Sequence, residues 1–452
     1  MNGYYNRRVT LRDNRRKLVF GVGTTFSRQL AVTLFQLLFT MLLARVLGKE
    51  NFGLYALALM LPQLFMKLLN LGLGPALVYF IARKDISYRT AFRRILLSTL
   101  ILSLIGISLE LIVIGFFRET VLPGVPRELL LISCWLFPVL LLQELLPNLL
   151  LGVERFRAYN ASYVVFPLVS LIAAYYLLIQ VRPHVNYAIF AFALGQLCAV
   201  IWLLWLAIRV GRDYANSSIQ SVSWPEMIGY SWKIHASNII AFLNYRIDIF
   251  LINLLAAPAA VGIYFVAVQI VEKLWLLSQA VNTAIFPHLS GKYKRSQSDT
   301  SVIEILGTFT FISTGITSLL LLIVSGWLVN ILFGIEYEES VSVLIILLPG
   351  ILANSVGRII SNDFSARGRP VLNVYVGILT VSVNVVANII LIPRIGPQGA
   401  AWATTLSYGI NFIVKLLIFR NLVNMNPLRV IFSFQASARV ARELLRRKVD
   451  PK

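Results

Sequence analysis

Residues 95–117 read ILLSTLILSLIGISLELIVIGFF, and Glu110 is the one charged side chain among them. A helix rises about 1.5 Å per residue, so this run is long enough to cross the roughly 30 Å of hydrocarbon in a bilayer. In hydrocarbon, backbone polar groups must find partners within the structure, and an α-helix satisfies them all internally. Transmembrane β-strands are short and alternate between polar and apolar residues, whereas this run is long and almost continuously apolar. The stretch therefore predicts a membrane-spanning helix.

The rest of the chain repeats this pattern. Of its 452 residues, 58% are hydrophobic and 13% charged, and the mean hydropathy is +0.76. Soluble domains carry about 25% charged residues, so the composition excludes a soluble enzyme, a disordered protein and a nucleic-acid-binding domain. The apolar runs predict an all-α membrane protein with about twelve spans. These are residues 19–43, 53–80, 94–117, 129–151, 160–180, 186–208, 228–254, 259–289, 302–328, 341–362, 371–392 and 398–419.

Lysine and arginine are distributed unevenly between the two sides of the membrane. With the N-terminus placed in the cytoplasm, 28 of them fall in cytoplasmic segments, 6 in the opposite loops and 7 within or beside the spans. Cytoplasmic loops carry an excess of these residues, so both termini are expected in the cytoplasm. The same distribution accounts for the net charge of +21 without nucleic acid as a partner.

Two similar tripeptides indicate an internal repeat. Residues 53–55 (GLY) begin the second span, and residues 262–264 (GIY) begin the eighth. Six helices per copy give parallel repeats with a cavity between two lobes; the alternative is chance similarity between apolar helices. The expected parts are a basic N-terminus, an N-terminal lobe, a cytoplasmic linker, a C-terminal lobe and a basic tail. Their boundaries are 1–18, 19–210, 211–227, 228–420 and 421–452.

The basic tail has an amphipathic pattern. Arginines and lysines alternate with apolar residues between positions 429 and 448. Such a segment is expected to lie on the inner leaflet, where anionic lipid attracts it. The alternative is a frayed, disordered tail.

Residues 42–58 read LLARVLGKENFGLYALA. This stretch resembles a signature of the polysaccharide repeat-unit flippases, the Wzx-type members of the multidrug/oligosaccharidyl-lipid/polysaccharide exporter superfamily. Residues 246–248 (RID), leading to 261–264 (VGIY), resemble the start of the second lobe in that family, and residues 399–404 (GAAWAT) resemble the entry to its last span. Asn70 stands where the family often has an acidic residue, which argues against carboxylate-dependent coupling at that point.

The resemblance implies a V-shaped carrier of two six-helix lobes around a central cavity, working by alternating access in a bacterial or archaeal cytoplasmic (inner) membrane. The implied cargo is an oligosaccharide on a polyprenyl diphosphate, moved from the inner to the outer leaflet for O-antigen or exopolysaccharide synthesis. Spans one, two, seven and eight would line the cavity. The implied partners are this lipid-linked oligosaccharide, membrane lipids and polysaccharide polymerase or assembly proteins. No catalytic residue, metal or organic cofactor is expected.

Several basic residues lie deep within the predicted spans. A charge at the bilayer centre costs about 2.5–3.5 kcal/mol on insertion scales, so such residues normally face a cavity or a partner. Arginine binds phosphate oxygens through two parallel hydrogen bonds, and a low-dielectric wall strengthens the contact. We therefore predict that cavity cations bind the diphosphate. The candidates are Arg28, Lys67, Arg246 and Lys273.

These basic residues have structural alternatives. Arg28 could extend its side chain to the cytoplasmic interface, and Lys67 or Lys273 could form a buried pair with Glu144. Four further charged residues lie near predicted cytoplasmic ends, where long side chains are expected to reach toward the headgroups. They are Lys233, Arg358, Asp363 and Lys415.

Deep carboxylates are candidates for coupling transport to a proton or sodium gradient. Asp248 and Arg246 are two residues apart on one helix, so they should point to different sides and not pair with each other. A carboxylate beside an arginine stays ionised, which argues against proton carrying unless substrate competes for the arginine. Glu110 and Glu144 are more simply interpreted as buried partners of basic residues. The coupling candidates are Asp248, Glu272 and Glu144.

Other functions fit parts of the sequence. A multidrug exporter of the same superfamily would favour carboxylates over cations in its cavity, and a flippase for the peptidoglycan lipid precursor often carries two extra spans. A membrane-embedded glycosyltransferase or polymerase would need a large outer loop with paired carboxylates, whereas the longest expected outer loop has about a dozen residues. The phosphate-cradling Gly-x-x-x-x-Gly-Lys-[Ser/Thr] motif of ATP-driven pumps is missing. Secondary transport is therefore the predicted class.

Overall fold

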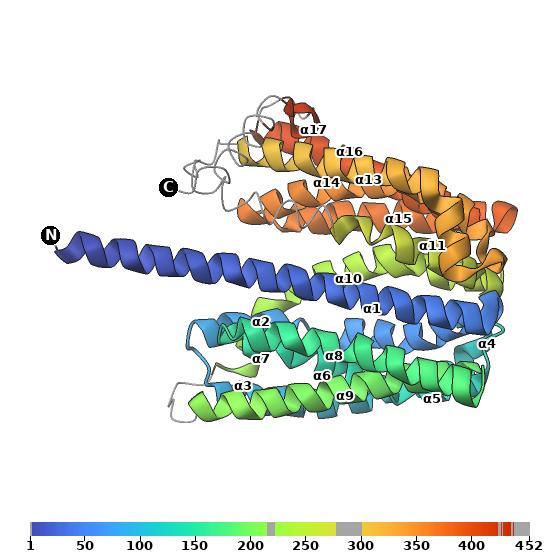
Figure 1. Cartoon of the computed structure of the whole chain (residues 1–452), viewed down its shortest axis with the longest axis horizontal. Helices are drawn as coiled ribbons and strands as arrows, with labels where there is room; N and C mark the ends of the chain where they lie inside the picture. The colour runs from blue at the N-terminus through green and yellow to red at the C-terminus, as the bar shows by residue number, and fades with distance from the viewer. Residues whose placement is uncertain are drawn as a thin grey trace. The chain divides into compact units, whose positions relative to one another are not determined.

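The computed structural model describes residues 2–214, 222–276, 301–423, 426, 428–434 and 437, with all of their side chains except those of 2–26, 233, 301, 302 and 366. This part of the chain is helical and contains no β-strand (Figure 1). It forms two compact units, Met1–Ile239 and Ile240–Lys452. The division falls within helix α10 (Trp224–Leu255), beyond the linker expected at 211–227.

The first unit is a bundle in which α1 packs along α8 and α8 packs along α9. Fully buried apolar side chains such as Leu43, Phe52, Leu57 and Phe137 form its interior. Its elements up to the shared helix α10 are α1 (Asn2–Leu69), α2 (Leu73–Ala82), α3 (Tyr88–Ile112), η1 (Val113–Phe117), α4 (Arg118–Val121), α5 (Arg127–Cys134), α6 (Phe137–Leu145), α7 (Pro147–Gly152), α8 (Phe156–Ala174), η2 (Tyr175–Val181), α9 (Val185–Gly211) and η3 (Arg212–Tyr214).

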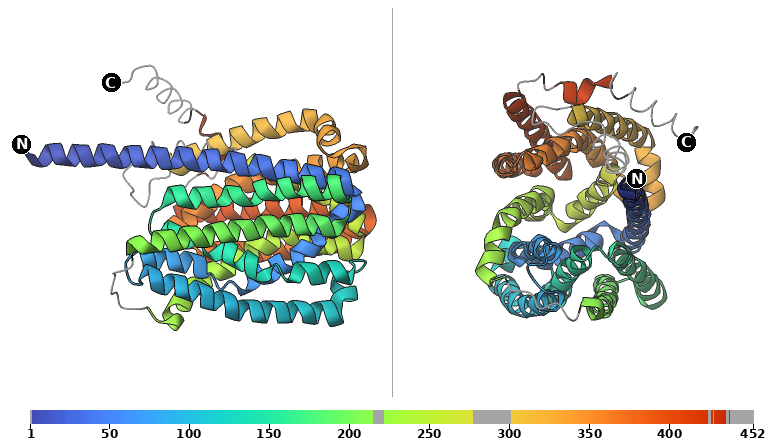
Figure 2. Two further views of the ribbon diagram at one scale, coloured as in Figure 1. Left: turned by 60° about the horizontal axis from the view of Figure 1, so that its bottom comes forward. Right: turned by 90° about the vertical axis from the view of Figure 1, so that its left-hand side faces the viewer.

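The second unit is centred on α14, which packs against α16 and α13, while α16 also packs against α15. Figure 2 shows these helices lying side by side within the unit. Phe333, Phe364 and Phe419 are fully buried between them. After the second half of α10, the elements are α11 (Pro258–Val271), α13 (Ser301–Phe333), η4 (Ile335–Tyr337), α14 (Glu339–Ala366), α15 (Val371–Ile395), α16 (Pro397–Val423) and α17 (Arg429–Phe432).

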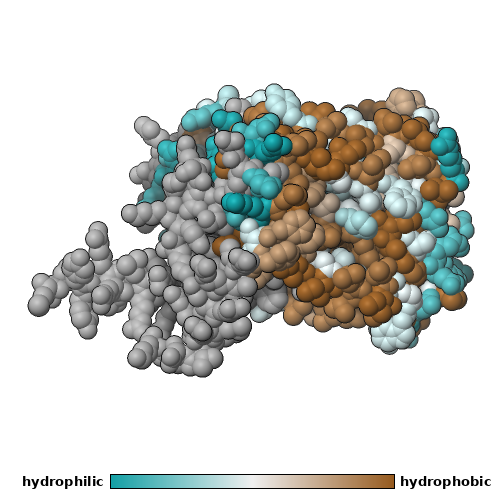
Figure 3. All heavy atoms as spheres, turned by 90° about the horizontal axis from the view of Figure 1, so that it is seen from above, coloured by the Kyte–Doolittle hydropathy of each residue, from teal (hydrophilic) through white to brown (hydrophobic). Residues whose placement is uncertain are grey.

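Large apolar side chains cover much of the outside. Leu104 on α3 and Ile323 on α13 expose 64% and 79% of their surface. Figure 3 shows a broad hydrophobic belt on one face, with hydrophilic residues toward its two ends. Soluble monomers rarely expose a contiguous apolar surface of this extent, whereas hydrocarbon requires it. The chain is therefore a multi-pass membrane protein, as the sequence predicts.

Ten helices of the described part are long and apolar enough to cross a membrane, or eleven if the bent pair Arg127–Cys134 and Phe137–Gly152 counts as one span. One of the ten, Ser27–Leu69, has 43 residues and contains Gly48 in a non-helical conformation with a φ of 72°. Gly48 divides this helix into two segments of about 20 residues, each the length of one span. The twelve expected spans are reached only if those segments are counted separately.

Two predicted spans are not single helices. The span at 53–80 breaks between α1 and α2, where Leu71 and Gly72 adopt positive φ values of 52° and 64°. The span at 129–151 is divided into α5, α6 and α7, with Pro138 and Pro147 in the first turns of the later two. The hydrophobic length of a run does not reveal such breaks. Proline does not locate them either, because it is tolerated in the first turn of a helix and also disrupts a helix interior.

Parts of other predictions lie outside the described residues. The span expected at 259–289 is described only as far as Leu276. The tail predicted to be amphipathic is described only at some positions up to residue 437. Within it, α17 packs against α13.

The first turn of α16 comes unusually close to α15. A Cβ added to Gly399 would lie 2.5 Å from the backbone carbonyl atoms of Leu391, which cannot move aside as a flexible side chain can. We expect Gly399→Ala to destabilise the protein by about 1–3 kcal/mol, the cost of overpacking. Gly409→Ala is the matched control, because a Cβ on this glycine of the same helix meets no atom within 4 Å. Equal thermal unfolding temperatures for the two variants in detergent would contradict this packing.

Candidate functional site

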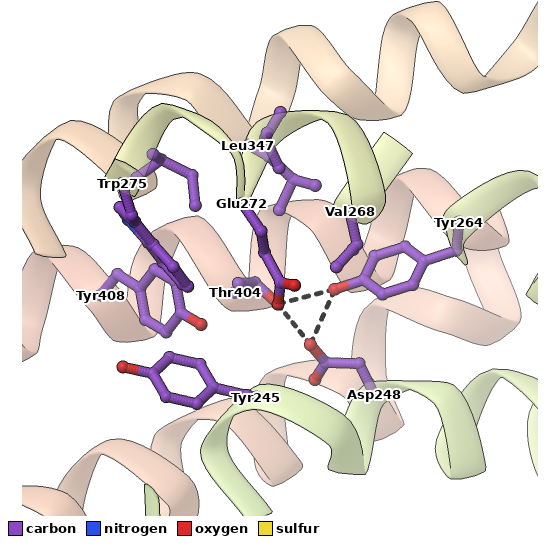
Figure 4. A pocket seen from close by; sticks show the side chains of 11 residues that line it. Tyr245, Asp248, Tyr264, Val268, Glu272, Trp275, Leu347, Thr404 and Tyr408 are labelled. Carbon is purple, nitrogen blue, oxygen red and sulfur yellow. Dashed lines mark hydrogen bonds between the residues drawn. The ribbon is translucent and has the colours of Figure 1, made fainter. Parts of the chain in front are cut away.

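A small cavity lies in the second unit between α10, α11, α14 and α16 (Figure 4). Its volume is about 20 Å³, and roughly 10–15 Å³ is enough to hold one water molecule. In this conformation the cavity admits a water molecule or a single ion, and it must widen to admit anything larger. It is lined by Tyr245, Asp248, Tyr264, Val268, Val271, Glu272, Trp275, Leu347, Ile351, Thr404 and Tyr408.

The carboxylate of Asp248 is 2% exposed and fully hydrogen-bonded. Tyr264 and Thr404 each donate a hydroxyl hydrogen bond of 2.7 Å to its Oδ2, and Asn388 Nδ2 donates one of 2.9 Å to its Oδ1. Figure 4 shows the triangle of Asp248, Tyr264 and Thr404 at the end of the cavity. Burying a charge is costly unless it is hydrogen-bonded, and these three donors meet that requirement. Because they come from α11, α15 and α16, the network also connects α10 to those helices.

The atoms around Asp248 are mostly oxygens. Besides the carboxylate and the two hydroxyls, the amide oxygen of Asn388 is buried and has no hydrogen-bond partner in the described part of the chain. Hard cations bind through carboxylate, amide and hydroxyl oxygens, whereas zinc and its neighbours prefer imidazole and thiolate. No group of three or more His, Cys, Asp or Glu gathers within the described residues. The arrangement therefore suits a hard monovalent cation rather than a transition metal.

Arg246 forms a two-point ion pair with Glu272, the residue that directly follows α11. Nη1 lies 2.9 Å from Oε1 and Nη2 lies 3.3 Å from Oε2, and the two side chains are 25% and 18% exposed. Arg246 and Asp248 belong to different networks, as their spacing predicts. Lys273 is half-buried and interacts electrostatically with both members of the pair. The guanidinium of Arg246 is thus already bound to a carboxylate.

Of the four residues expected to reach toward the headgroups, Arg358 on α14 and Lys415 on α16 instead pack against neighbouring helices. Asp363 pairs with Arg367, and the side chain of Lys233 lies outside the described residues. The guanidinium carbon of Arg358 lies 3.9 Å from the centre of a Trp275 ring, and its Nη2 donates a 2.9 Å hydrogen bond to the Tyr245 hydroxyl. Lys415 is 7% exposed. The two helices approach closely through Gly350 and Gly357. Small residues are enriched where membrane helices approach closely, and these two glycines were the available clue to this burial.

The first unit contains a separate group of predicted residues. Lys67 Nζ lies 2.7 Å from Glu144 Oε1, and the side chains are 31% and 38% exposed. This is the pairing considered as the alternative for Lys67. Arg28 lies over the rings of Tyr163 and Tyr159, at 4.8 and 5.6 Å from their centres, a favourable cation–π geometry. The structure thus places Arg28, Lys67 and Glu144 in the first unit, and Arg246, Asp248, Glu272 and Lys273 in the second.

Glu110 differs from its expected role as the partner of a basic residue. It is fully buried in α3, and neither carboxyl oxygen has a hydrogen-bond partner among the described residues. Its neighbourhood includes Cys134 rather than a cation. The sequence shows that Glu110 lies deep in a span, but it does not show which side chains of other helices surround it.

Residues 18–292 match the family model of the polysaccharide biosynthesis proteins. The chain belongs to this family. The match includes α1 from residue 18 onward and every element from α2 to α11, and with them Arg28, Lys67, Arg246 and Asp248. The resemblance found in the sequence motifs is confirmed.

A relative from Haloferax volcanii carries the name "Probable low-salt glycan biosynthesis flippase Agl15". It is 26% identical over 408 residues, which cover 88% of this chain and 80% of the relative. Two solved structures share the fold at 16% identity. A lipid II flippase MurJ in an inward closed conformation has a TM-score of 0.72, covering 94% of this chain and 92% of its own. An inward-facing multidrug resistance MATE family transporter of the MOP superfamily has a TM-score of 0.71, covering 87% and 94%. The exporter-superfamily fold is therefore confirmed for this polysaccharide biosynthesis family member.

Removing one member of the Arg246–Glu272 pair should be more harmful than removing both. Glu272→Ala leaves a guanidinium without its counter-ion in a partly buried place, and we expect a loss of about 3 kcal/mol in the free energy of unfolding. The double variant Arg246→Met/Glu272→Leu should recover most of that loss, because apolar replacements of similar size require no counter-ion. Denaturation in detergent measures the free energy of unfolding of the single and the double variant. Equal losses of this free energy in the two would show that the charges do not stabilise each other.

Proposed function

We propose that this protein is a flippase that moves polyprenyl-diphosphate-linked oligosaccharide units from the inner to the outer leaflet of the cytoplasmic membrane. The family match over residues 18–292 carries this proposal, and the glycan flippase relative aligned along 88% of the chain supports a glycan cargo. The transporter fold shared with MurJ and MATE supports transport by alternating access rather than an enzymatic step. The distribution of Lys and Arg supports cytoplasmic termini.

The proposed diphosphate ligands are the cations predicted from the sequence. Two of them, Lys67 and Arg246, are held by the carboxylates of Glu144 and Glu272. Both pairs are partly exposed, so exchange of a carboxylate for a substrate phosphate would not leave a lone buried charge. Arg28 and Lys273 supply further positive charge. A polymerase of the glycan pathway is the expected recipient of the translocated unit.

For coupling, we propose that a cation binds at Asp248. Glu144 and Glu272 are each engaged by a basic residue, whereas the charge of Asp248 is balanced by neutral donors alone among the described residues. A bound sodium ion would replace those hydrogen bonds with direct contacts to the same oxygens. A proton at this carboxylate is the alternative.

Liposomes containing the purified protein test the flippase activity directly. A fluorescent lipid diphosphate carrying an oligosaccharide is placed in both leaflets, and a membrane-impermeant quencher is then added outside. We expect nearly complete quenching with the protein and about half without it, because flipping exposes the inner pool. A cationic drug serves as a competitor. Drug transport without glycolipid movement would favour a multidrug exporter, and quenching equal to that of empty liposomes would exclude the proposed function.

Asp248→Asn tests coupling. The variant retains the size of the side chain but loses the charge that would bind a cation, so we expect glycolipid flipping to lose its dependence on an imposed sodium or proton gradient. Glu338→Gln is the control, because this carboxylate is exposed at the end of the second unit. If flipping by the wild-type protein is unchanged when each gradient is collapsed with ionophores, coupling at Asp248 is excluded.

A further inference from the structure

In the described part of the second unit, a half-buried arginine on α14 and a buried lysine on α16 have no carboxylate partner. Among the described residues, neither Arg358 nor Lys415 has an Asp or Glu within ion-pair distance. The nearest acidic residue along α14, Asp363, pairs with Arg367 at 2.6 Å. Arg246, by contrast, is held at two points by Glu272. Among the described residues, Arg358 and Lys415 therefore bring positive charge without a paired carboxylate to the α14–α16 contact.

The two cations are neighbours. The stem of Lys415 packs over Gly357, the residue before Arg358: its Cδ lies 3.8 Å from the position that a Cβ on Gly357 would occupy. Their charges interact unfavourably across the helix contact. Two like charges in a partly dehydrated place reduce the stability of the fold, so helix packing alone does not account for this pair.

Unused hydrogen-bond donors surround the same place. Of the five N–H donors of a guanidinium, Arg358 gives one to Tyr245. Trp275, whose ring stacks on Arg358, is 8% exposed, and its Nε1 has no partner within the residues that the structure describes. Asn354, one turn before Arg358 on the same face of α14, is 4% exposed and its Nδ2 has no partner among the described residues. Donors and positive charge without an acceptor match an anion that has several oxygens.

We propose that Arg358, Lys415, Trp275 and Asn354 form a phosphate-binding subsite, and that the second unit holds a diphosphate there. The stacked and hydrogen-bonded guanidinium is fixed in orientation, which suits two-point recognition of phosphate oxygens. The ammonium of Lys415 adds a point charge beside it. That the diphosphate belongs to a lipid-linked glycan rests on the proposed function; the subsite itself does not.

The subsite adjoins the cavity described above, because Tyr245 and Trp275 line that cavity and also contact Arg358. The cavity admits only a water molecule or an ion as it stands. Binding a diphosphate therefore requires these two aromatic side chains to move, which exposes the guanidinium that they cover.

Calorimetric titration of the full-length protein with farnesyl diphosphate tests the subsite. We expect Arg358→Gln and Lys415→Met each to weaken binding by roughly tenfold or more, the loss that one charge-assisted hydrogen bond represents. Arg358→Lys, which keeps the charge but loses the planar fork, should bind between wild type and Arg358→Gln. Arg394→Gln is the matched control, because this arginine is exposed at the end of α15; its affinity should equal that of the wild type.

Stability separates binding from packing. Lys415→Met removes a buried cation without a counter-ion, so its melting temperature should equal or exceed that of the wild type while its affinity falls. A lower melting temperature with unchanged affinity would overturn the proposal. Equal binding of farnesol, which lacks the phosphates, would overturn it as well.

Two further ligands identify the source of the phosphate. Competition by inorganic pyrophosphate supports a site that recognises the phosphates themselves. Competition by phosphatidylglycerol in nanodiscs supports the same site with a lipid headgroup as its occupant. If the wild-type protein binds farnesyl diphosphate but does not flip the glycolipid, the proposed function is excluded and the subsite is retained. If the wild-type protein flips the glycolipid but Arg358→Gln and Lys415→Met bind farnesyl diphosphate as the wild type does, the subsite is excluded and the proposed function is retained.

Discussion

Hydrocarbon offers a polar side chain neither a hydrogen bond nor a counter-ion, so every polar group inside this protein must be satisfied by the protein itself. Asp248 meets this requirement with three neutral donors, and Arg246 meets it with the carboxylate of Glu272. The same requirement fixes how the helices pack, because each network connects side chains from different helices. Among the described residues, Glu110, Arg358 and Lys415 depart from it, and for the last two the surrounding unused donors favour the proposed phosphate subsite over a purely structural role.

The fold was predictable from the sequence to the extent that it depends on hydrophobic length and side-chain period. The helical class, the membrane-spanning runs and the family follow from residues such as 42–58 and 95–117. The breaks in the helices were not predictable, because they depend on tertiary contacts. Gly72, for example, adopts a positive φ where a Cβ would lie 2.9 Å from the carbonyl oxygen of Ser231. That residue is more than 150 positions along the chain, so no local pattern reveals the contact.

For the candidate site, depth within a span identified which residues were unusual, but not which residues they contact. Lys67, Arg246, Asp248 and Glu272 were recognised as buried charges, and the pairing of Lys67 with Glu144 was among the alternatives. The partner of Arg246 was missed, although it lies on the next helix. Arg358 and Lys415 were set aside because they lie near helix ends in sequence. Burial there depends on how closely α14 approaches α16, which is set by glycines that hydropathy does not weigh.

Helix α10 belongs to both compact units, and this limits where the chain can be divided. Its first half is held within the first unit, where Tyr230 stacks on Tyr79 at 4.3 Å and Ser231 Oγ donates a 2.7 Å hydrogen bond to the Leu71 carbonyl. A cut in the segment before Trp224, where composition alone suggests a linker, would remove those partners from the N-terminal fragment. That fragment would then have to reassociate with the other to fold completely. The segment at 211–227 is thus not the place where the two compact units separate.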